Sequence, residues 1–149
     1  MIKIKTKIIK YLICLLPWFL SSLIFKVDTN YYKNLNLPPL APPTIIFPIV
    51  WTILYFLISI AIYKTPKKTS NYKIYLLINY LSNQLFTLSF FTLKNNLLAL
   101  ADCLIVLISS LYLYFETKDL NQKSAVYLIP YIIWNIFASY LSLSFLLLN

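Results

Sequence analysis

Residues 31–55 read YYKNLNLPPLAPPTIIFPIVWTILY, a proline-rich loop that opens directly onto an apolar helix. Proline pairs at positions 38–39 and 42–43 stiffen the loop, and the second pair stands where the start of a helix tolerates proline. Residues 44–63 carry no charge and are long enough to cross the hydrocarbon core of a bilayer. The stretch therefore predicts a stiff loop leading into a transmembrane helix that displays aromatic side chains.

The rest of the chain continues this apolar character. Hydrophobic residues make up 60% of the 149 positions and charged residues only 11%, whereas a soluble domain needs a far more charged surface. Runs with little or no charge predict five transmembrane helices, near 8–25, 44–63, 73–92, 97–115 and 125–147, with a Pro-rich loop over 26–43. We expect an all-α integral membrane bundle in which residues 1–149 form a single five-helix domain.

The lysines predict the orientation of this bundle. With five spans, ten of the thirteen lysines lie on the side of the N-terminus and three on the other side. Short loops rich in lysine favour the cytoplasmic side, so we expect a multi-pass protein of the cytoplasmic membrane with its N-terminus inside and its C-terminus outside. The same arrangement explains the net charge of +9 as cytoplasmic flanks beside anionic lipid, and nothing resembles a nucleic-acid module.

The residue types leave little room for catalysis. The chain has no histidine, no glycine and only four acidic residues. A Ser–His pair and a glycine-rich phosphate loop are therefore impossible, and a metal site is not expected. Asp102 is the one acid inside a predicted span, where it sits either at the water-accessible rim or against a partner or wet cavity. These features favour a non-enzymatic protein that requires no cofactor.

Three predicted helices carry stripes of aromatic or amide side chains at helical spacing. The stripes are Phe47, Trp51 and Tyr55 on the second helix, Asn79, Asn83 and Thr87 on the third, and Tyr131, Trp134 and Ala138 on the fifth. If the stripes converge, they line an aromatic pocket with a few amide donors, which suits a flat apolar ligand with polar edges. Each stripe also has a structural interpretation, because Trp and Tyr anchor helices at membrane interfaces and Asn joins helices through hydrogen bonds.

In matching order over nearly the whole chain, these segments resemble the TspO/MBR family, the tryptophan-rich sensory proteins and translocator proteins. The loop YYKNLNLPPLAPP is similar to the family pattern WYxxLxKPxWxPP and keeps Tyr32, Pro42 and Pro43. The stretch FPIVWTILY resembles FxPVWTxLY, and PYIIW on the fifth helix keeps the family's tryptophan. The third helix keeps the family amide as Asn83 and the first of a phenylalanine pair as Phe90.

The resemblance implies a five-helix membrane protein, often a homodimer, with a ligand pocket beneath the first loop. Family members bind porphyrins, sterols in some lineages, and synthetic isoquinoline or benzodiazepine drugs. Trp51 and Trp134 match two family tryptophans tied to porphyrin binding and its light-dependent breakdown, which favours a tetrapyrrole such as protoporphyrin IX or heme over cholesterol. The predicted ligand-binding residues are Tyr32, Pro42, Pro43, Phe47, Trp51, Tyr55, Asn79, Asn83, Phe86, Phe90, Tyr131, Trp134 and Ala138.

The chain also departs from the family pattern, and more than one function stays open. Only three tryptophans occur, and on the fifth helix Asn135 and Ser142 replace residues typical of the family. One hypothesis is a protein that senses, sequesters or transfers a tetrapyrrole. A second is a light-dependent porphyrin-degrading enzyme that uses Trp51 and Trp134. A third is a transporter of tetrapyrroles or other lipophilic ligands, for which the sequence shows no inverted repeat.

Overall fold

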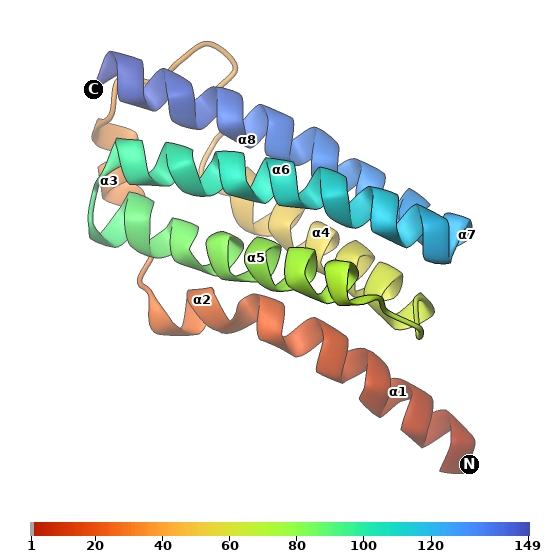
Figure 1. Ribbon diagram of the computed structural model, residues 1–149. Coiled ribbons are helices and arrows are strands. Elements are labelled where there is room, and N and C mark those ends of the chain that lie inside the picture. The colour runs from red at the N-terminus through yellow and green to blue at the C-terminus, as the bar shows by residue number, and fades with distance from the viewer. Residues whose placement is uncertain (1) are drawn as a thin grey trace.

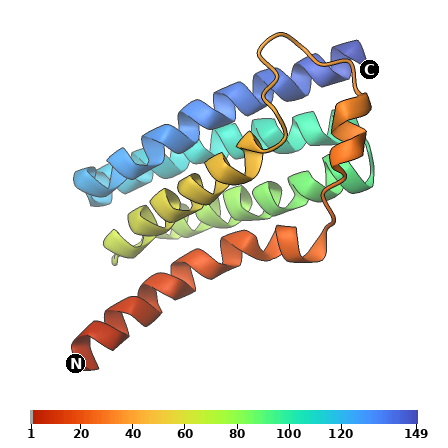
Figure 2. The ribbon, with the colours of Figure 1, turned by 180° about the vertical axis from the view of Figure 1, so that it is seen from behind.

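A computed structural model describes residues 2–149, with side chains from residue 4 onward, and this part of the chain is helical without strands. The elements are α1 (Ile2–Leu15), the 3-10 turn η1 (Leu16–Phe19), α2 (Leu20–Ile24), α3 (Thr29–Asn34), α4 (Ile46–Lys64), α5 (Ser70–Thr87), the π-helical turn η2 (Leu88–Thr92), α6 (Asn96–Leu120), α7 (Gln122–Ala125), η3 (Val126–Leu128) and α8 (Ile129–Leu148). The long helices run side by side, and the N-terminal end of α1 diverges from the others (Figures 1 and 2).

Four segments are long and apolar enough to cross a membrane: Ile4–Ile24, Ile46–Lys64, Asn96–Leu120 and Gln122–Leu148. The prediction of an all-α membrane protein is confirmed, and four of the five predicted spans coincide with these segments. The predicted third span corresponds to α5 and η2, which are helical but less apolar. The reason is local, since α5 contains buried amides such as Asn79, Asn83 and Gln84 that lower its mean hydropathy.

A proline breaks the first span, and α5 compensates for the break. Pro17 lies in the 3-10 turn between α1 and α2, where backbone groups lose their helical partners. The Tyr80 hydroxyl donates to the Pro17 carbonyl (3.1 Å), and Gln84 Nε2 donates to the Trp18 carbonyl (3.2 Å). Gln84 Oε1 accepts from the backbone N–H of Ser21 (2.7 Å). Neighbouring side chains thus satisfy the freed backbone groups, as a break inside a bilayer requires.

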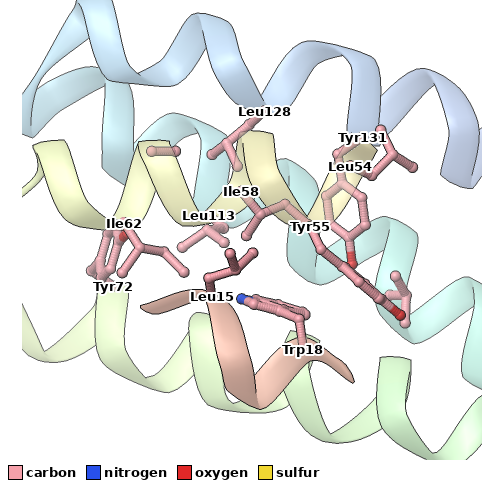
Figure 3. Packing of buried hydrophobic residues seen from close by; sticks show 12 residues of the cluster. Leu15, Trp18, Leu54, Tyr55, Ile58, Ile62, Tyr72, Leu113, Leu128 and Tyr131 are labelled. Atoms are coloured by element: carbon pink, nitrogen blue, oxygen red, sulfur yellow. The ribbon is translucent and has the colours of Figure 1, made fainter. Parts of the chain in front are cut away.

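The main apolar core lies where the first span meets α4, and α5, α6, η3 and the start of α8 also contribute side chains to it (Figure 3). Trp18 is 2% exposed, stacks on Tyr55 with ring centroids 5.6 Å apart, and meets Tyr80 edge to face at 5.3 Å. Leu15, one turn earlier, belongs to the same cluster as Ile58 of α4. The first span is therefore packed against the bundle by aromatic contacts as well as by hydrogen bonds.

The predicted loop over residues 26–43 contains a short helix, α3, that the sequence pattern did not indicate. Asp28 caps it, because its carboxylate accepts from the backbone N–H groups of Asn30 (3.1 Å) and Tyr31 (3.0 Å). The same carboxylate pairs with Lys94 at 3.3 Å. The Tyr31 N–H, followed by the Lys94 ammonium, holds the pKa of Asp28 below its usual range. These contacts attach one end of the loop to the turn before α6.

The other end of the loop is attached to α8. The backbone N–H of Asn36 donates to Asn149 Oδ1 (2.8 Å), and Asn149 Nδ2 donates back to the Asn36 carbonyl (3.3 Å). The Tyr140 hydroxyl donates to the Pro39 carbonyl (2.9 Å). The loop is thus an ordered cover over one end of the bundle.

Candidate functional site

A cavity of about 380 Å³ lies beneath this loop, between α2, α4, α5, α6 and α8. Its volume falls in the range of small-molecule pockets. Most of its lining is aromatic or aliphatic, and none of the described residues that form it is charged. The cavity therefore suits an apolar ligand that needs few polar contacts.

The structure brings nine of the thirteen predicted site residues into this lining. They are Tyr32, Phe47, Trp51, Tyr55, Asn83, Phe86, Phe90, Trp134 and Ala138. They come from the loop, from α4, α5 and α8, and from η2, so part of each of the three stripes faces one cavity.

The other four predicted residues lie behind the lining. Pro42 accepts a hydrogen bond from the Tyr32 hydroxyl (2.8 Å), and the Pro43 carbonyl accepts from the backbone N–H of Ile46 at the start of α4 (3.0 Å). Asn79 and Tyr131 are fully buried between helices. These residues contact the cavity wall from outside and position it.

A chain of hydrogen bonds joins the lining to the buried amides. The Tyr55 hydroxyl donates to Asn83 Oδ1 (3.0 Å), and Asn83 Nδ2 donates to the Tyr131 hydroxyl (3.3 Å). Tyr131 in turn donates to Asn79 Oδ1 (2.9 Å), and Asn79 Nδ2 donates to Ser109 Oγ (3.0 Å). The network connects α4, α5, α6 and α8. Asn79 therefore acts in the structure as a link between helices, whereas Asn83 both links helices and faces the cavity.

Aromatic contacts set the positions of the two lining tryptophans. Trp51 is tilted against Tyr55 at 5.5 Å between ring centroids and meets Tyr131 edge to face at 6.2 Å. Trp134 meets Phe47 edge to face at 6.3 Å. Such pairs restrict ring motion. The two indoles of α4 and α8 thus pack against neighbouring rings and line the same cavity.

Asp102 lies outside the cavity lining. It is half-buried in the second turn of α6, and its carboxylate accepts a hydrogen bond from the hydroxyl of Ser89 in η2. The Ser89 hydroxyl is thus a polar partner for this carboxylate.

Several lining residues were missed on sequence grounds. They are Phe19, Ser21, Ser22, Val27, Thr29, Thr44, Pro48, Thr52, Cys103, Val106, Asn135 and Phe145. The other lining residues, Thr87, Phe91, Leu141 and Ser142, belong to or adjoin the stripes recognised by helical spacing. Helical spacing could have indicated Asn135 and Phe145 on α8, because they lie three residues before and seven residues after Ala138 and share its face. No pattern points to the residues from the first span, since their approach depends on the break at Pro17.

Apolar helices around an aromatic, uncharged cavity define an all-helical membrane protein, and this cavity is its candidate functional site. The TspO/MBR family model matches residues 11–148, and the chain belongs to this family. The resemblance found in the sequence motifs is therefore confirmed.

Three relatives from this family align with the chain over most of their length. The tryptophan-rich protein TspO of Bacillus cereus is 35% identical over 144 residues, covering 93% of each chain. The protein of the same name from Chlorobaculum tepidum is 31% identical, covering 92% of this chain and 91% of the relative. A tryptophan-rich sensory protein from Cereibacter sphaeroides is 30% identical, covering 87% and 82%.

Proposed function

We propose that the chain binds a porphyrin or related tetrapyrrole in this cavity and holds it for sensing, sequestration or transfer. The observation that supports the proposal is that Trp51 and Trp134, from two different helices, line one uncharged aromatic cavity of about 380 Å³. Indole rings stack on flat π systems, and the apolar lining favours a macrocycle over a charged metabolite. The homodimer implied by the sequence resemblance stays a prediction.

We also propose that α5 together with η2 crosses the membrane, as the third of five spans along the chain. Its polar residues, including Asn79, Asn83 and Gln84, point into the bundle and are hydrogen-bonded there. Its outer face is apolar, as the 57% exposure of Leu77 and the 50% exposure of Leu81 show. An inward amide face and an outward leucine face match a helix packed in a bilayer.

A fifth span places the two ends of α5 on opposite sides of the cytoplasmic membrane, with the lysine-rich 64–69 loop inside. Alkaline phosphatase, active only outside, is expected to be active when fused after residue 94 and inactive when fused after residue 68. Green fluorescent protein at the same two sites should report the reverse. Equal reporter activity at the two fusion sites would mean that α5 does not cross the membrane. The prediction of an inside N-terminus would then lose its support, because it counts lysines over five spans.

Ligand binding is tested by titrating the detergent-solubilised chain with protoporphyrin IX and following porphyrin absorbance. We expect saturation at micromolar ligand, and weakening by about tenfold or more, equivalent to about 1.4 kcal/mol, in Trp51→Phe/Trp134→Phe. The matched control is Trp18→Phe, because Trp18 is buried in the core and does not line the cavity. If the absorbance change does not saturate and is the same in the parent chain and in Trp51→Phe/Trp134→Phe, the porphyrin partitions into micelles. That result would contradict the tetrapyrrole assignment.

The same placement of Trp51 and Trp134 at one cavity also favours the second candidate, a light-dependent porphyrin-degrading enzyme. Illuminating the complex separates the two functions. A binding protein bleaches at most one equivalent of porphyrin per site, whereas an enzyme continues over many turnovers and stops doing so in Trp51→Phe/Trp134→Phe.

A further inference from the structure

The α8 wall of the cavity carries buried polar groups that have no partner. Trp134 Nε1, Asn135 Nδ2 and Ser142 Oγ are buried atoms without a hydrogen bond among the described residues, and all three side chains line the cavity. Asn135 is 2% exposed and Ser142 is 3% exposed. Buried polar groups are nearly always paired, so unpaired ones at a cavity indicate where a ligand atom completes the bonding.

The other amide of the lining does not share this property. Asn83 accepts from Tyr55 and donates to Tyr131, so it is already bonded within the helix network. On α8 itself, the Ser139 hydroxyl donates to the Asn135 carbonyl (2.8 Å) and lies outside the lining. The unmet bonding capacity is therefore concentrated on one side of the cavity, around adjacent residues Trp134 and Asn135.

The chemistry of these groups selects a hydrogen-bond acceptor. An indole nitrogen can only donate, and the unpaired Asn135 Nδ2 is also a donor. The described lining contains no Lys or Arg, so an ionised carboxylate placed there would be buried without a counter-charge. A neutral carbonyl or ester oxygen satisfies the donors without that penalty.

Aromatic contacts connect this wall to the loop. Tyr32 of the loop meets Phe47 and Phe145 edge to face at 5.4 and 5.6 Å, and Phe47 meets Trp134 edge to face at 6.3 Å.

Resting on the proposed function, we infer that the Trp134–Asn135 wall is a recognition subsite for a neutral carbonyl or ester oxygen, with Asn135 as the residue that determines specificity. The ligand class of the cavity is then a flat apolar molecule with an uncharged acceptor edge. Carboxylates are not bound at this wall, so the acidic groups of a tetrapyrrole face away from it.

The test compares two probes of the same shape, 9-fluorenone and fluorene, which differ only by one carbonyl. Equilibrium dialysis against the full-length chain in detergent, corrected with protein-free micelles, gives the affinity of each. We expect the chain to prefer fluorenone by about tenfold, and Asn135→Leu to reduce the preference to about one while keeping fluorene binding. Ser139→Ala, with its hydroxyl outside the lining, is the matched control and should keep the preference.

A chain that binds the two probes equally, or an Asn135→Leu variant that keeps the full preference, overturns the inference. If Asn135→Leu does not fold, Trp134→Phe removes the neighbouring donor while keeping a ring, and an unchanged preference there overturns it as well. Protoporphyrin IX titrated into the same preparation separates the two proposals. A carbonyl preference without porphyrin saturation supports the subsite and contradicts the tetrapyrrole, whereas porphyrin saturation without a carbonyl preference contradicts the subsite alone.

Discussion

Trp18→Ala is expected to lower the free energy of unfolding by about 4 kcal/mol, within the range for removing a buried aromatic ring. Trp18 is 2% exposed, and its ring contacts Tyr55 at 5.6 Å and Tyr80 at 5.3 Å. Helices in a bilayer are held by such packing rather than by exclusion from water, so an empty volume between the first span and α4 is not refilled by an equivalent contact. Because Phe19 and Ser21 of the cavity lining follow Trp18 in the chain, Trp18→Ala should also lower protoporphyrin affinity, whereas Trp18→Phe keeps a ring that holds the first span in place.

Unfolding is measured in mixed micelles of rising SDS content, by the reactivity of the buried Cys103 thiol in a Cys14→Ser background. Trp18→Phe keeps an aromatic ring at the site and is expected to lose about 1–2 kcal/mol, as a partial large-to-small replacement does. A Trp18→Ala chain that unfolds within about 1 kcal/mol of the parent would show that the first span is not held by this contact.

Asn79→Leu has the second largest expected effect, a loss of about 3 kcal/mol at similar side-chain volume. Asn79 is fully buried and makes three hydrogen bonds between helices: it donates to Val106 O and Ser109 Oγ, both at 3.0 Å, and accepts from the Tyr131 hydroxyl at 2.9 Å. Leucine leaves the Tyr131 hydroxyl without an acceptor in a buried position. Since Tyr131 also accepts from Asn83, the loss reaches the cavity wall, and ligand affinity should decrease.

The same thiol-reactivity assay measures this loss, and a double-mutant cycle identifies its origin. Asn79→Leu/Tyr131→Phe removes both partners of the bond, so its destabilisation should be smaller than the sum of the two single changes. Ser109→Ala is the matched control within the network, because the Val106 carbonyl remains available to Asn79. Strict additivity in the cycle would mean that Asn79 acts through its volume and not through the network.

The apolar runs were enough to predict most of the helices. Residues 44–63 coincide with α4 (Ile46–Lys64), because twenty uncharged residues have few alternatives to a helix in a bilayer. The same criterion is weaker for α5, whose amides lower the hydropathy of the segment. The helix α3 carries no such signal, because it is too short for a hydrophobic period and begins at the Asp28 cap inside a polar loop.

For the candidate site, too, the sequence predicted some of the residues and not others. The spacing of Phe47, Trp51 and Tyr55 predicted one face of α4, and all three line the cavity. An identical spacing on α5 did not separate Asn83, which lines the cavity, from Asn79, which is bonded behind it. Both residues occupy the same stripe, and only the position of α6 and α8 determines which amide is covered.

The sequence by itself determined the class of the protein, the order of its helices and the aromatic character of the site. Those properties depend on composition and on the helical period, which act along one segment at a time. Only the tertiary structure decided which polar groups are paired. Gln84 bonds the backbone freed by the break at Pro17, and Asn79 bonds Ser109. Asn135 Nδ2 has no hydrogen-bond partner among the described residues. Hydrogen bonds between helices depend on packing distances that no single segment contains, and those distances leave the unpaired donors at the cavity.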